Sequence, residues 1–195
     1  MEQKVFVEIG ACDFDNLDAL LDEGWIGYFV EPIPVYYNSL IEKIKKSGRV
    51  CHFTNVAISN YTGTVEMTYI DPKTTDQQWV RGISHMTSRV HQSSRLIPRN
   101  VNEGHDIGKP VTIEVPCWSL DVYLERQGLT NIDMLRMDVE GHELQILCEY
   151  SWTVMPKRIK IEHKFVHTDR LRLLLESKGY VVMEAGDDFY CIMKE

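Results

Sequence analysis

Short apolar runs alternate with amphipathic helical patterns along most of the chain. The runs that predict strands are Lys4–Ile9, Trp25–Glu31, Val50–Ile58, Thr64–Ile70, Val111–Val115, Asn131–Asp138, Arg158–Glu162, Tyr180–Glu184 and Phe189–Met193. Apolar residues at helical spacing predict helices over Leu17–Gly24, Val35–Lys46, Ser119–Gln127, the residues after Glu140, and Thr168–Lys178. Strands that alternate with helices of this length are typical of a parallel, doubly wound α/β sheet.

Two parts of the chain depart from this alternation. The last two predicted strands flank Gly186 and Asp187, a pattern typical of an antiparallel hairpin. Residues 71–110 have weak periodicity and many Ser, Thr, Asn and Gln residues. Long insertions of this kind in compact domains are usually functional or disordered. We therefore expect one domain over residues 1–195, with a substrate-binding insertion at 71–110.

Three of the predicted strands end in acidic residues. The runs VFVEIG, YFVEP and IDMLRMDVEG carry Glu8, Glu31 and Asp138 to the carboxyl end of a strand. In an open α/β sheet, ligands bind at that end, where the strand order reverses. We therefore expect a carboxylate-rich site that suits a cationic ligand with hydroxyl groups and repels pyrophosphate.

The loop after the first strand argues against a nicotinamide dinucleotide. Gly10 and Glu31 have the spacing of about 20 residues that is typical of a ribose-binding pair. A pyrophosphate site, however, needs a second glycine for close approach of the backbone, and this loop carries Asp13 and Asp15 instead. The phosphate-binding pattern GxxxxGK[ST] does not occur in the sequence.

S-adenosylmethionine suits the predicted strand edge better. We expect Glu31 to accept the ribose hydroxyls and Glu8 or Asp138 to meet the α-ammonium group. The backbone N–H groups after Gly10 would meet the α-carboxylate, and the adenine would lie beside Asn55–Ile58. The predicted cofactor-binding residues are Glu8, Gly10, Ala11, Cys12, Glu31, Asn55, Ala57 and Asp138.

Glu162 and His163 end the next predicted strand and are candidates for acid–base chemistry with Asp138. A hydroxyl nucleophile needs a base near its proton, and a histidine beside a carboxylate supplies one at neutral pH. The alternative is a surface Glu-His pair. Ligand type alone would also allow Asp138, Glu162 and His163 to share a metal ion. Their spacing does not support such a site, so no metal is assigned.

The substrate that carries the reacting hydroxyl is expected to meet residues from the insertion and from the turn after Asp138. Residues 79–99 contain arginines and histidines but no acid, which predicts a lid that pairs guanidinium groups with a carboxylate or phosphate. The alternative is a solvated surface segment. The predicted substrate-binding residues are Arg81, His85, Arg89, Glu140 and His142.

Composition limits the partners of the chain. The net charge of −8 argues against general nucleic-acid binding, which requires clustered positive charge. The five cysteines are scattered without a CxxC pair, which favours a reducing compartment. The amino-terminal pattern predicts a strand and not a signal peptide, and no apolar run reaches the length of a membrane span. We expect a cytoplasmic protein with a small-molecule or saccharide substrate, no membrane partner, and an oligomeric state that the sequence leaves open.

Seven segments resemble the FkbM-type S-adenosylmethionine-dependent methyltransferases, in the order of that family. They are VFVEIGACDFDN, YFVEPIP, NVAIS, GTVEM, CWSLDVYL, IDMLRMDVEGHELQIL and RIKIEHK. The resemblance covers nearly the whole chain apart from 71–110. It implies a class I, Rossmann-like methyltransferase fold, with a seven-stranded sheet whose last strand is antiparallel. It also implies methyl transfer to oxygen, often on sugars or small metabolites.

The first motif departs from the usual Gly-Ala-Asn-x-Gly loop of the family, because Cys12 and Phe14 stand at the Asn and second Gly positions. Two alternatives therefore stay open. One is a nucleoside-binding module of the same fold without catalysis, and the other is an NAD(P)-dependent oxidoreductase.

Overall fold

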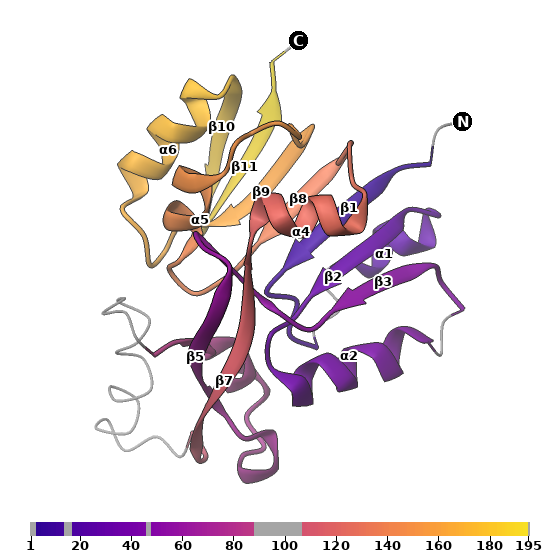
Figure 1. The fold of residues 1–195 in the computed structure, drawn as a ribbon, viewed down its shortest axis with the longest axis vertical. Coiled ribbons are helices and arrows are strands. Elements are labelled where there is room, and N and C mark those ends of the chain that lie inside the picture. Colours follow the sequence, from indigo (N-terminus) through magenta and orange to yellow (C-terminus); the bar gives the residue numbers. More distant parts are fainter. Residues whose placement is uncertain (1–2, 14–16, 46–47, 88–106, 195) are drawn as a thin grey trace.

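A computed structural model describes residues 3–13, 17–45, 48–87 and 107–194. Its main feature is a seven-stranded sheet with the strand order β10-β11-β9-β8-β1-β2-β3 (Figure 1). The strands are β1 (Val5–Ile9), β2 (Ile26–Val30), β3 (Cys51–Thr54), β8 (Met134–Met137), β9 (Arg158–Glu162), β10 (Tyr180–Ala185) and β11 (Asp188–Met193).

Most neighbouring strands of this sheet are parallel. The pairs β1–β2, β2–β3, β1–β8 and β8–β9 all run in the same direction. Strand β11 runs antiparallel to both of its neighbours, β9 and β10. The predicted mostly parallel sheet with an antiparallel last strand and a closing hairpin is therefore confirmed.

The predicted helices are present with shifts of a few residues at their ends. They are α1 (Asp18–Asp22), α2 (Pro34–Lys45), α4 (Leu120–Gln127), α5 (Glu143–Glu149) and α6 (Thr168–Ser177). Helix α4 begins and ends as its sequence predicts. The Ser119 hydroxyl accepts a hydrogen bond from the Val122 N–H, and Gly128 ends the helix in the left-handed conformation.

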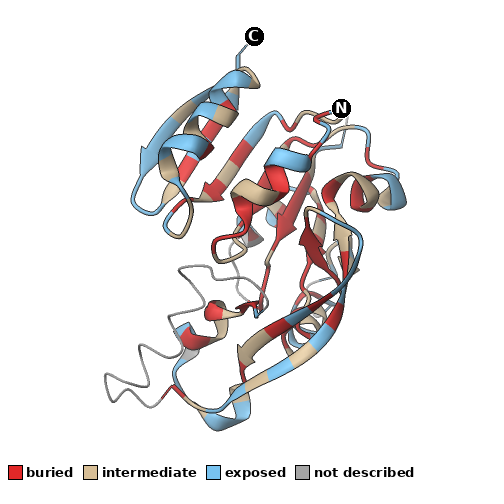
Figure 2. Cartoon of the chain, turned by 60° about the vertical axis from the view of Figure 1, so that its left-hand side comes forward, coloured by how far each residue is buried: buried red, intermediate tan, exposed pale blue. Residues whose placement is uncertain are grey.

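The helices cover the two faces of the sheet with separate hydrophobic clusters. Val7 and Ile9 of β1 pack in one cluster with apolar residues of α4, α5 and α6. Phe6, next to Val7 on the same strand, packs in another cluster with residues of α1 and α2. This division follows from the alternation of side chains along a strand. The central strands are consequently buried, as Figure 2 shows.

A second, four-stranded sheet has the order β4-β7-β5-β6. Its strands are β4 (Ala57–Ser59), β5 (Gly63–Ile70), β6 (His85–Met86) and β7 (Pro110–Ser119). Strands β5 and β7 extend away from the large sheet at the bottom of Figure 1. Their pairing is antiparallel over their length, so residues before and after the insertion lie side by side.

The prediction of one strand over Val50–Ile58 is wrong. The segment divides at Asn55 and Val56 into β3 of the large sheet and β4 of the small one. The Asn55 side-chain amide donates hydrogen bonds to the carbonyls of Glu31, at 2.7 Å, and Pro32, at 3.0 Å. These bonds fix the chain at the bend, and Ala57–Ser59 then pairs with β7.

The described part of the insertion is short and partly packed. It contains two 3₁₀ helices, η1 (Pro72–Thr74) and η2 (Gln78–Ile83), followed by β6. Val80 and Ile83 are buried with Ile70 and Ile107 in a small apolar cluster. Within the described ranges, no helix has the length and hydropathy that would let it cross a membrane.

The end of β1 approaches the end of β8 too closely for a side chain. Gly10 has a φ of 78°, and a Cβ atom there would lie 1.8 Å from the backbone oxygen of Asp138. The Gly10 N–H donates to the Val30 carbonyl at 3.0 Å, and the Asp138 N–H donates to the Ile9 carbonyl at 3.0 Å. Glycine at this position therefore lets three strand ends converge.

We expect Gly10→Ala to destabilise the fold much more than Gly179→Ala. Gly179 has a φ of 91°, but a Cβ there would meet nothing within 4 Å. Its replacement should cost only the left-handed strain of about 1–2 kcal/mol. The Gly10 variant should add an overpacking cost of about 1–3 kcal/mol, because backbone must move. Urea unfolding of both variants measures the difference, and equal losses would contradict the prediction.

Candidate active site

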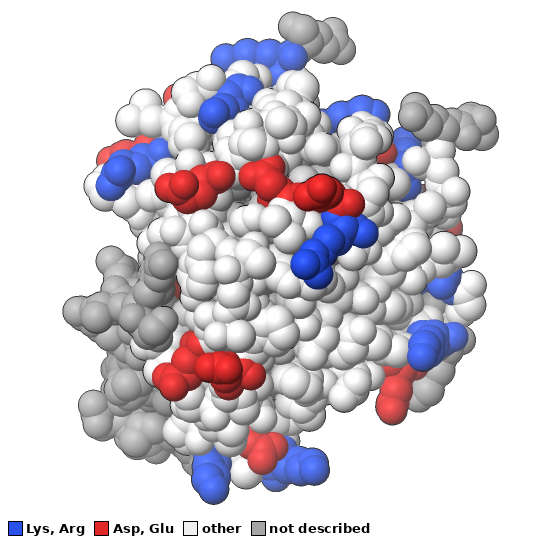
Figure 3. Space-filling view, in the orientation of Figure 1, with Lys and Arg blue, Asp and Glu red and all other residues white. Residues whose placement is uncertain are grey.

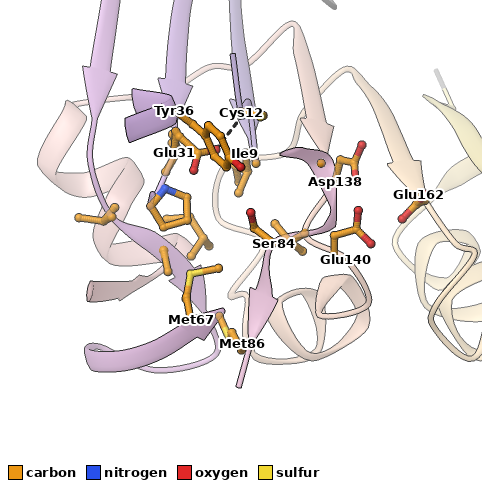
Figure 4. Close-up of a pocket in the computed structure, with 18 of the residues that line it drawn as sticks. Ile9, Cys12, Glu31, Tyr36, Met67, Ser84, Met86, Asp138, Glu140 and Glu162 are labelled. Atoms are coloured by element: carbon orange, nitrogen blue, oxygen red, sulfur yellow. Dashed lines mark hydrogen bonds between the residues drawn. The ribbon is translucent and has the colours of Figure 1, made fainter. Parts of the chain in front are cut away.

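An open cavity of about 780 Å³ lies at the carboxyl ends of β1, β2, β8 and β9. Ile9 and Glu31 lie on the side of the first two strands, whereas Asp138 and Glu162 follow or end β8 and β9 (Figure 4). Gly10 also lines the cavity. The small sheet supplies an apolar wall that includes Met67 and Met86.

Glu31 is buried at the end of β2, and backbone groups hold its carboxylate. Oε2 accepts a hydrogen bond from the Cys12 N–H and Oε1 accepts one from the Ile33 N–H, both at 2.7 Å. Burial raises the pKa of Glu31 to about 7, although the two hydrogen bonds oppose the rise. Each carboxylate oxygen offers more than one acceptor position. Glu31 therefore remains able to accept hydrogen bonds from a pair of hydroxyl groups in the cavity.

The N–H groups of Gly10, Ala11 and Cys12 are engaged in hydrogen bonds within the protein. Those of Gly10 and Ala11 donate to the Val30 carbonyl, and that of Cys12 donates to Glu31. Gly10 and Cys12 line the cavity, whereas Ala11 is completely buried behind it. Of the amides after Gly10 that the sequence predicts to meet an α-carboxylate, those of Ala11 and Cys12 tie the first loop to the end of β2 instead. Residues 14–16 of this loop lie outside the described residues.

The first loop also holds the insertion in place. The buried Asp13 carboxylate accepts hydrogen bonds from the Ser39 hydroxyl at 3.0 Å and from Arg81 Nη1 at 2.7 Å. The Cys12 thiol donates to the Arg81 carbonyl at 3.7 Å. Arg81, which the sequence predicts to bind substrate, lines the cavity, but its guanidinium pairs with Asp13. Arg89, the other predicted acceptor-binding arginine, lies outside the described residues.

Three carboxylates crowd the opposite side of the cavity. Asp138, Glu140 and Glu162 each place one oxygen within 4.8 Å of the others. Figure 4 labels all three side chains at the cavity. Carboxylate oxygens at this spacing suit a cationic group or a hard divalent cation. Glu140 has a φ of 55°, which is uncommon for a residue other than glycine. Strained conformations of this kind cluster at active sites.

Burial and mutual repulsion change the protonation of these carboxylates. Burial raises the pKa of Glu140 to about 9, and Asp138 and Glu162 add to the rise. Burial raises the pKa of Glu162 to about 7, with Asp138 as the next contributor. Burial also raises the pKa of Asp138, while Arg136 opposes the rise. Near neutral pH Glu140 therefore keeps its proton more fully than Glu162 does.

The structure separates His163 from Glu162. Glu162 lines the cavity, but His163 is buried against Phe189, with ring centroids 4.3 Å apart. His163 Nε2 lies 3.8 Å from the nearest oxygen of Glu184. Successive residues of a strand point to opposite faces. The predicted Glu-His pair is therefore not brought together at the cavity.

Two other predicted histidines are also buried away from the cavity wall. His142 Nε2 lies 3.1 Å from the Ser59 hydroxyl, and His85 Nδ1 lies 3.2 Å from the Ile83 carbonyl. Burial lowers the pKa of His85. Neither His142 nor His85 lines the cavity, although both are predicted to bind substrate. Ser84, next to His85 in the chain, does line it.

Of the remaining residues predicted to bind the cofactor, one lines the cavity and two do not. Ala57 lines the cavity. Asn55 instead holds the bend between β3 and β4, and Glu8 is fully buried beside Arg136. Sequence reasoning missed Arg136, which lines the cavity from within an apolar run, and Tyr36, whose hydroxyl donates to the Ile70 carbonyl at 2.6 Å. A basic residue inside a predicted buried strand was the available signal for Arg136.

Basic and acidic side chains both lie on the face of the molecule shown in Figure 3. The basic side chains are scattered over this face, and several acidic groups lie between them.

Comparison with protein families gives one match. Residues 8–182 match the family model described as the methyltransferase FkbM domain. No curated protein and no solved structure matches the chain significantly.

We expect Glu143→Gln to stabilise the fold at alkaline pH. Glu143 is buried, and burial raises its pKa from 4.5 to about 8. The folded state therefore keeps a proton that the unfolded chain releases, so this group lowers stability as pH rises from about 4.5 to about 8. The amide removes that cost while its oxygen can still accept the Val139 N–H.

The melting temperature of the Glu143→Gln variant should exceed that of the unmodified protein by more than about 3 °C at pH 8.5, or about 1 kcal/mol for a domain of this size. The gain should shrink toward pH 5. Thermal denaturation across this pH range measures it, and a gain that is larger at pH 5 than at pH 8.5 would contradict the prediction.

Proposed function

Because the chain belongs to the FkbM methyltransferase family, we propose that it transfers a methyl group from S-adenosylmethionine to a hydroxyl group of a sugar or small polar metabolite. The observation that carries the proposal is the convergence of Gly10, Glu31 and Asp138 from three adjacent strands on one cavity. The strand order, with antiparallel β11 between β9 and β10, supports assignment to the class I, Rossmann-like methyltransferases.

The residues of the cavity fit this cofactor. Glu31 offers two carboxylate oxygens to the ribose diol, and the apolar residues Val56–Ile58 offer a surface for adenine. Asp138 offers negative charge to the amino-acid end, whose ammonium group is positive. Bound S-adenosylmethionine supplies an activated methyl group on a positively charged sulfur. A pyrophosphate would instead meet several carboxylates, which supports this cofactor over NAD(P).

We assign the role of base to Glu162. Its carboxylate lines the cavity, and Oε2 has no hydrogen-bond partner among the described residues. A base is most effective when its pKa lies near the working pH, and burial brings the pKa of Glu162 to about 7. In this role Glu162 takes the proton that the acceptor hydroxyl releases as the new carbon–oxygen bond forms.

The acidic side of the cavity favours a neutral, hydroxyl-rich acceptor over an anionic one. Glu162, the assigned base, lies beside Asp138 and Glu140, so the acceptor hydroxyl must approach an acidic cluster. Arg81, which the sequence predicts to bind an anion, is paired with Asp13 at 2.7 Å. An anionic acceptor would therefore have to compete with Asp13 for Arg81 and approach this acidic cluster.

Binding of S-adenosylhomocysteine, the demethylated cofactor, tests the proposed function directly. At 100 times its dissociation constant it should stabilise the protein by about 2.7 kcal/mol, by mass action. We expect a rise in melting temperature with this ligand and none with NAD or ATP. The rise should be lost in Glu31→Ala, whose ribose acceptor is absent. Equal shifts with NAD would overturn the cofactor assignment.

Replacing the proposed base should remove turnover but not cofactor binding. We expect Glu162→Gln to lower kcat at least about 100-fold, the typical contribution of a general base. Because the base must be ionised, kcat of the unmodified protein should fall as pH drops below about 7, the pKa of Glu162. The variant should lose this dependence.

The acceptor for this measurement comes from a screen of sugars and hydroxylated metabolites for methyl transfer. Glu184→Gln is the matched control, because Glu184 lies outside the cavity and pairs with Arg172. If Glu162→Gln keeps its turnover and pH profile, another group is the base.

A further inference from the structure

Arg136 is a buried basic residue in the middle of β8. Its side chain is 10% exposed, and it lines the cavity. In the parallel pairing of β1 and β8, Arg136 is the register partner of Glu8. The two side chains therefore lie next to each other on the same face of the sheet.

The guanidinium of Arg136 joins two carboxylates from different strands. Nη1 lies 2.8 Å from Glu8 Oε1, and Nη2 lies 3.0 Å from Asp138 Oδ2. Asp138 is two residues after Arg136, so both point to the same side of an extended chain. The planar fork of one arginine thus fixes the Asp138 carboxylate relative to β1.

This contact determines which way Asp138 faces. Glu140 and Glu162 repel its carboxylate from the cavity side, Asp188 repels it from β11, and Lys160 of β9 attracts it. Lys160 is itself paired with Asp188 at 3.0 Å. Arg136 is therefore the cation that contacts Asp138 directly and opposes the repulsion from the neighbouring acids.

We propose that Arg136 is a positioning residue that holds the Asp138 carboxylate toward the amino-acid end of the bound cofactor. The inference rests on the proposed function, because it assigns a role within the same site. Lysine would not serve equally well. An ammonium group is a point charge on a flexible stem, whereas a guanidinium donates in a fixed plane to two acceptors.

A matched pair of ligands tests this role by calorimetry. S-adenosylhomocysteine carries the amino-acid end, whereas methylthioadenosine shares its adenosine part and lacks that end. We expect Arg136→Met to weaken binding of S-adenosylhomocysteine more than tenfold and to change the affinity for methylthioadenosine less than twofold. Glu31→Ala is the control and should weaken both ligands. A purely structural loss would also affect both ligands.

The conservative variant separates positioning from charge alone. Arg136→Lys keeps the charge but cannot hold Glu8 and Asp138 in one plane, so it should weaken S-adenosylhomocysteine binding at least threefold and leave methylthioadenosine unaffected. Affinity equal to that of the unmodified protein would overturn the need for the planar fork.

Loss of Arg136 also leaves Glu8 buried without this charge partner, which can prevent folding. The comparison is therefore repeated in the Glu8→Gln background, where Glu8→Gln with Arg136→Met is measured against Glu8→Gln alone. The same selective loss of S-adenosylhomocysteine binding is expected. An equal affinity of the two proteins for this ligand would overturn the inference.

A double-mutant cycle separates positioning from direct contact with the ligand. If Arg136 acts through Asp138, then Asp138→Asn combined with Arg136→Met should weaken S-adenosylhomocysteine binding hardly more than either change alone. Additive losses would mean that Arg136 contacts the ligand itself, and the positioning role would be overturned. Absence of binding of either ligand to the unmodified protein would instead overturn the proposed function.

Discussion

Carboxylates gathered at one edge of a buried sheet repel one another and resist loss of water, and this constraint organises the cavity. Each acid meets the constraint differently. Glu31 accepts two backbone hydrogen bonds, Asp138 contacts Arg136, and Asp13 contacts Arg81. Glu162 Oε2 has no hydrogen-bond partner among the described residues, and burial raises the pKa of Glu162 to about 7. Acids of one chemical type thus acquire separate roles through their surroundings.

The small sheet completes the cavity that the large sheet begins. The bend at Asn55 redirects the chain from β3 into β4, and this places β5 and β7 beside the carboxyl edge. Met67 of β5 and Met86 of β6 then form the apolar wall. The pairing of Arg81 with Asp13 fastens the insertion to the first loop. The wall is therefore held by contacts between segments far apart in the sequence.

Those long-range contacts explain which features the sequence could predict. Strand ends follow from local patterns, and so the positions of Gly10, Glu31 and Asp138 were predictable from periodicity and spacing. The division of the third predicted strand was not, because it depends on hydrogen bonds from Asn55 to a neighbouring strand end. The apolar wall was missed for a similar reason, since Met67 and Met86 look like ordinary core residues until the strands pair.

The histidines show a different limit. Adjacent positions in a strand face opposite sides, so Glu162 and His163 separate even though they are neighbours in the chain. The same alternation explains why Arg136 and Asp138 do meet, since they are two residues apart. Two residues spaced two apart along a predicted strand are thus more informative about a shared site than two adjacent residues. This spacing was the signal that could have revealed Arg136 beside Asp138.

In the turn after β8, buried acids both lower the stability of the fold and shape the backbone of the site. Glu143, at the start of α5, accepts the Val139 N–H at 2.8 Å and so fixes the backbone beside Glu140. Glu140 is held there with a φ of 55°, and its carboxylate lines the cavity. Burial raises the pKa of both residues above neutrality, so ionising them lowers the stability of the fold. A gain in stability from Glu143→Gln that left the turn intact would separate that electrostatic cost from the hydrogen bond that shapes the turn. The two effects are separable because an amide oxygen accepts the same hydrogen bond without carrying charge.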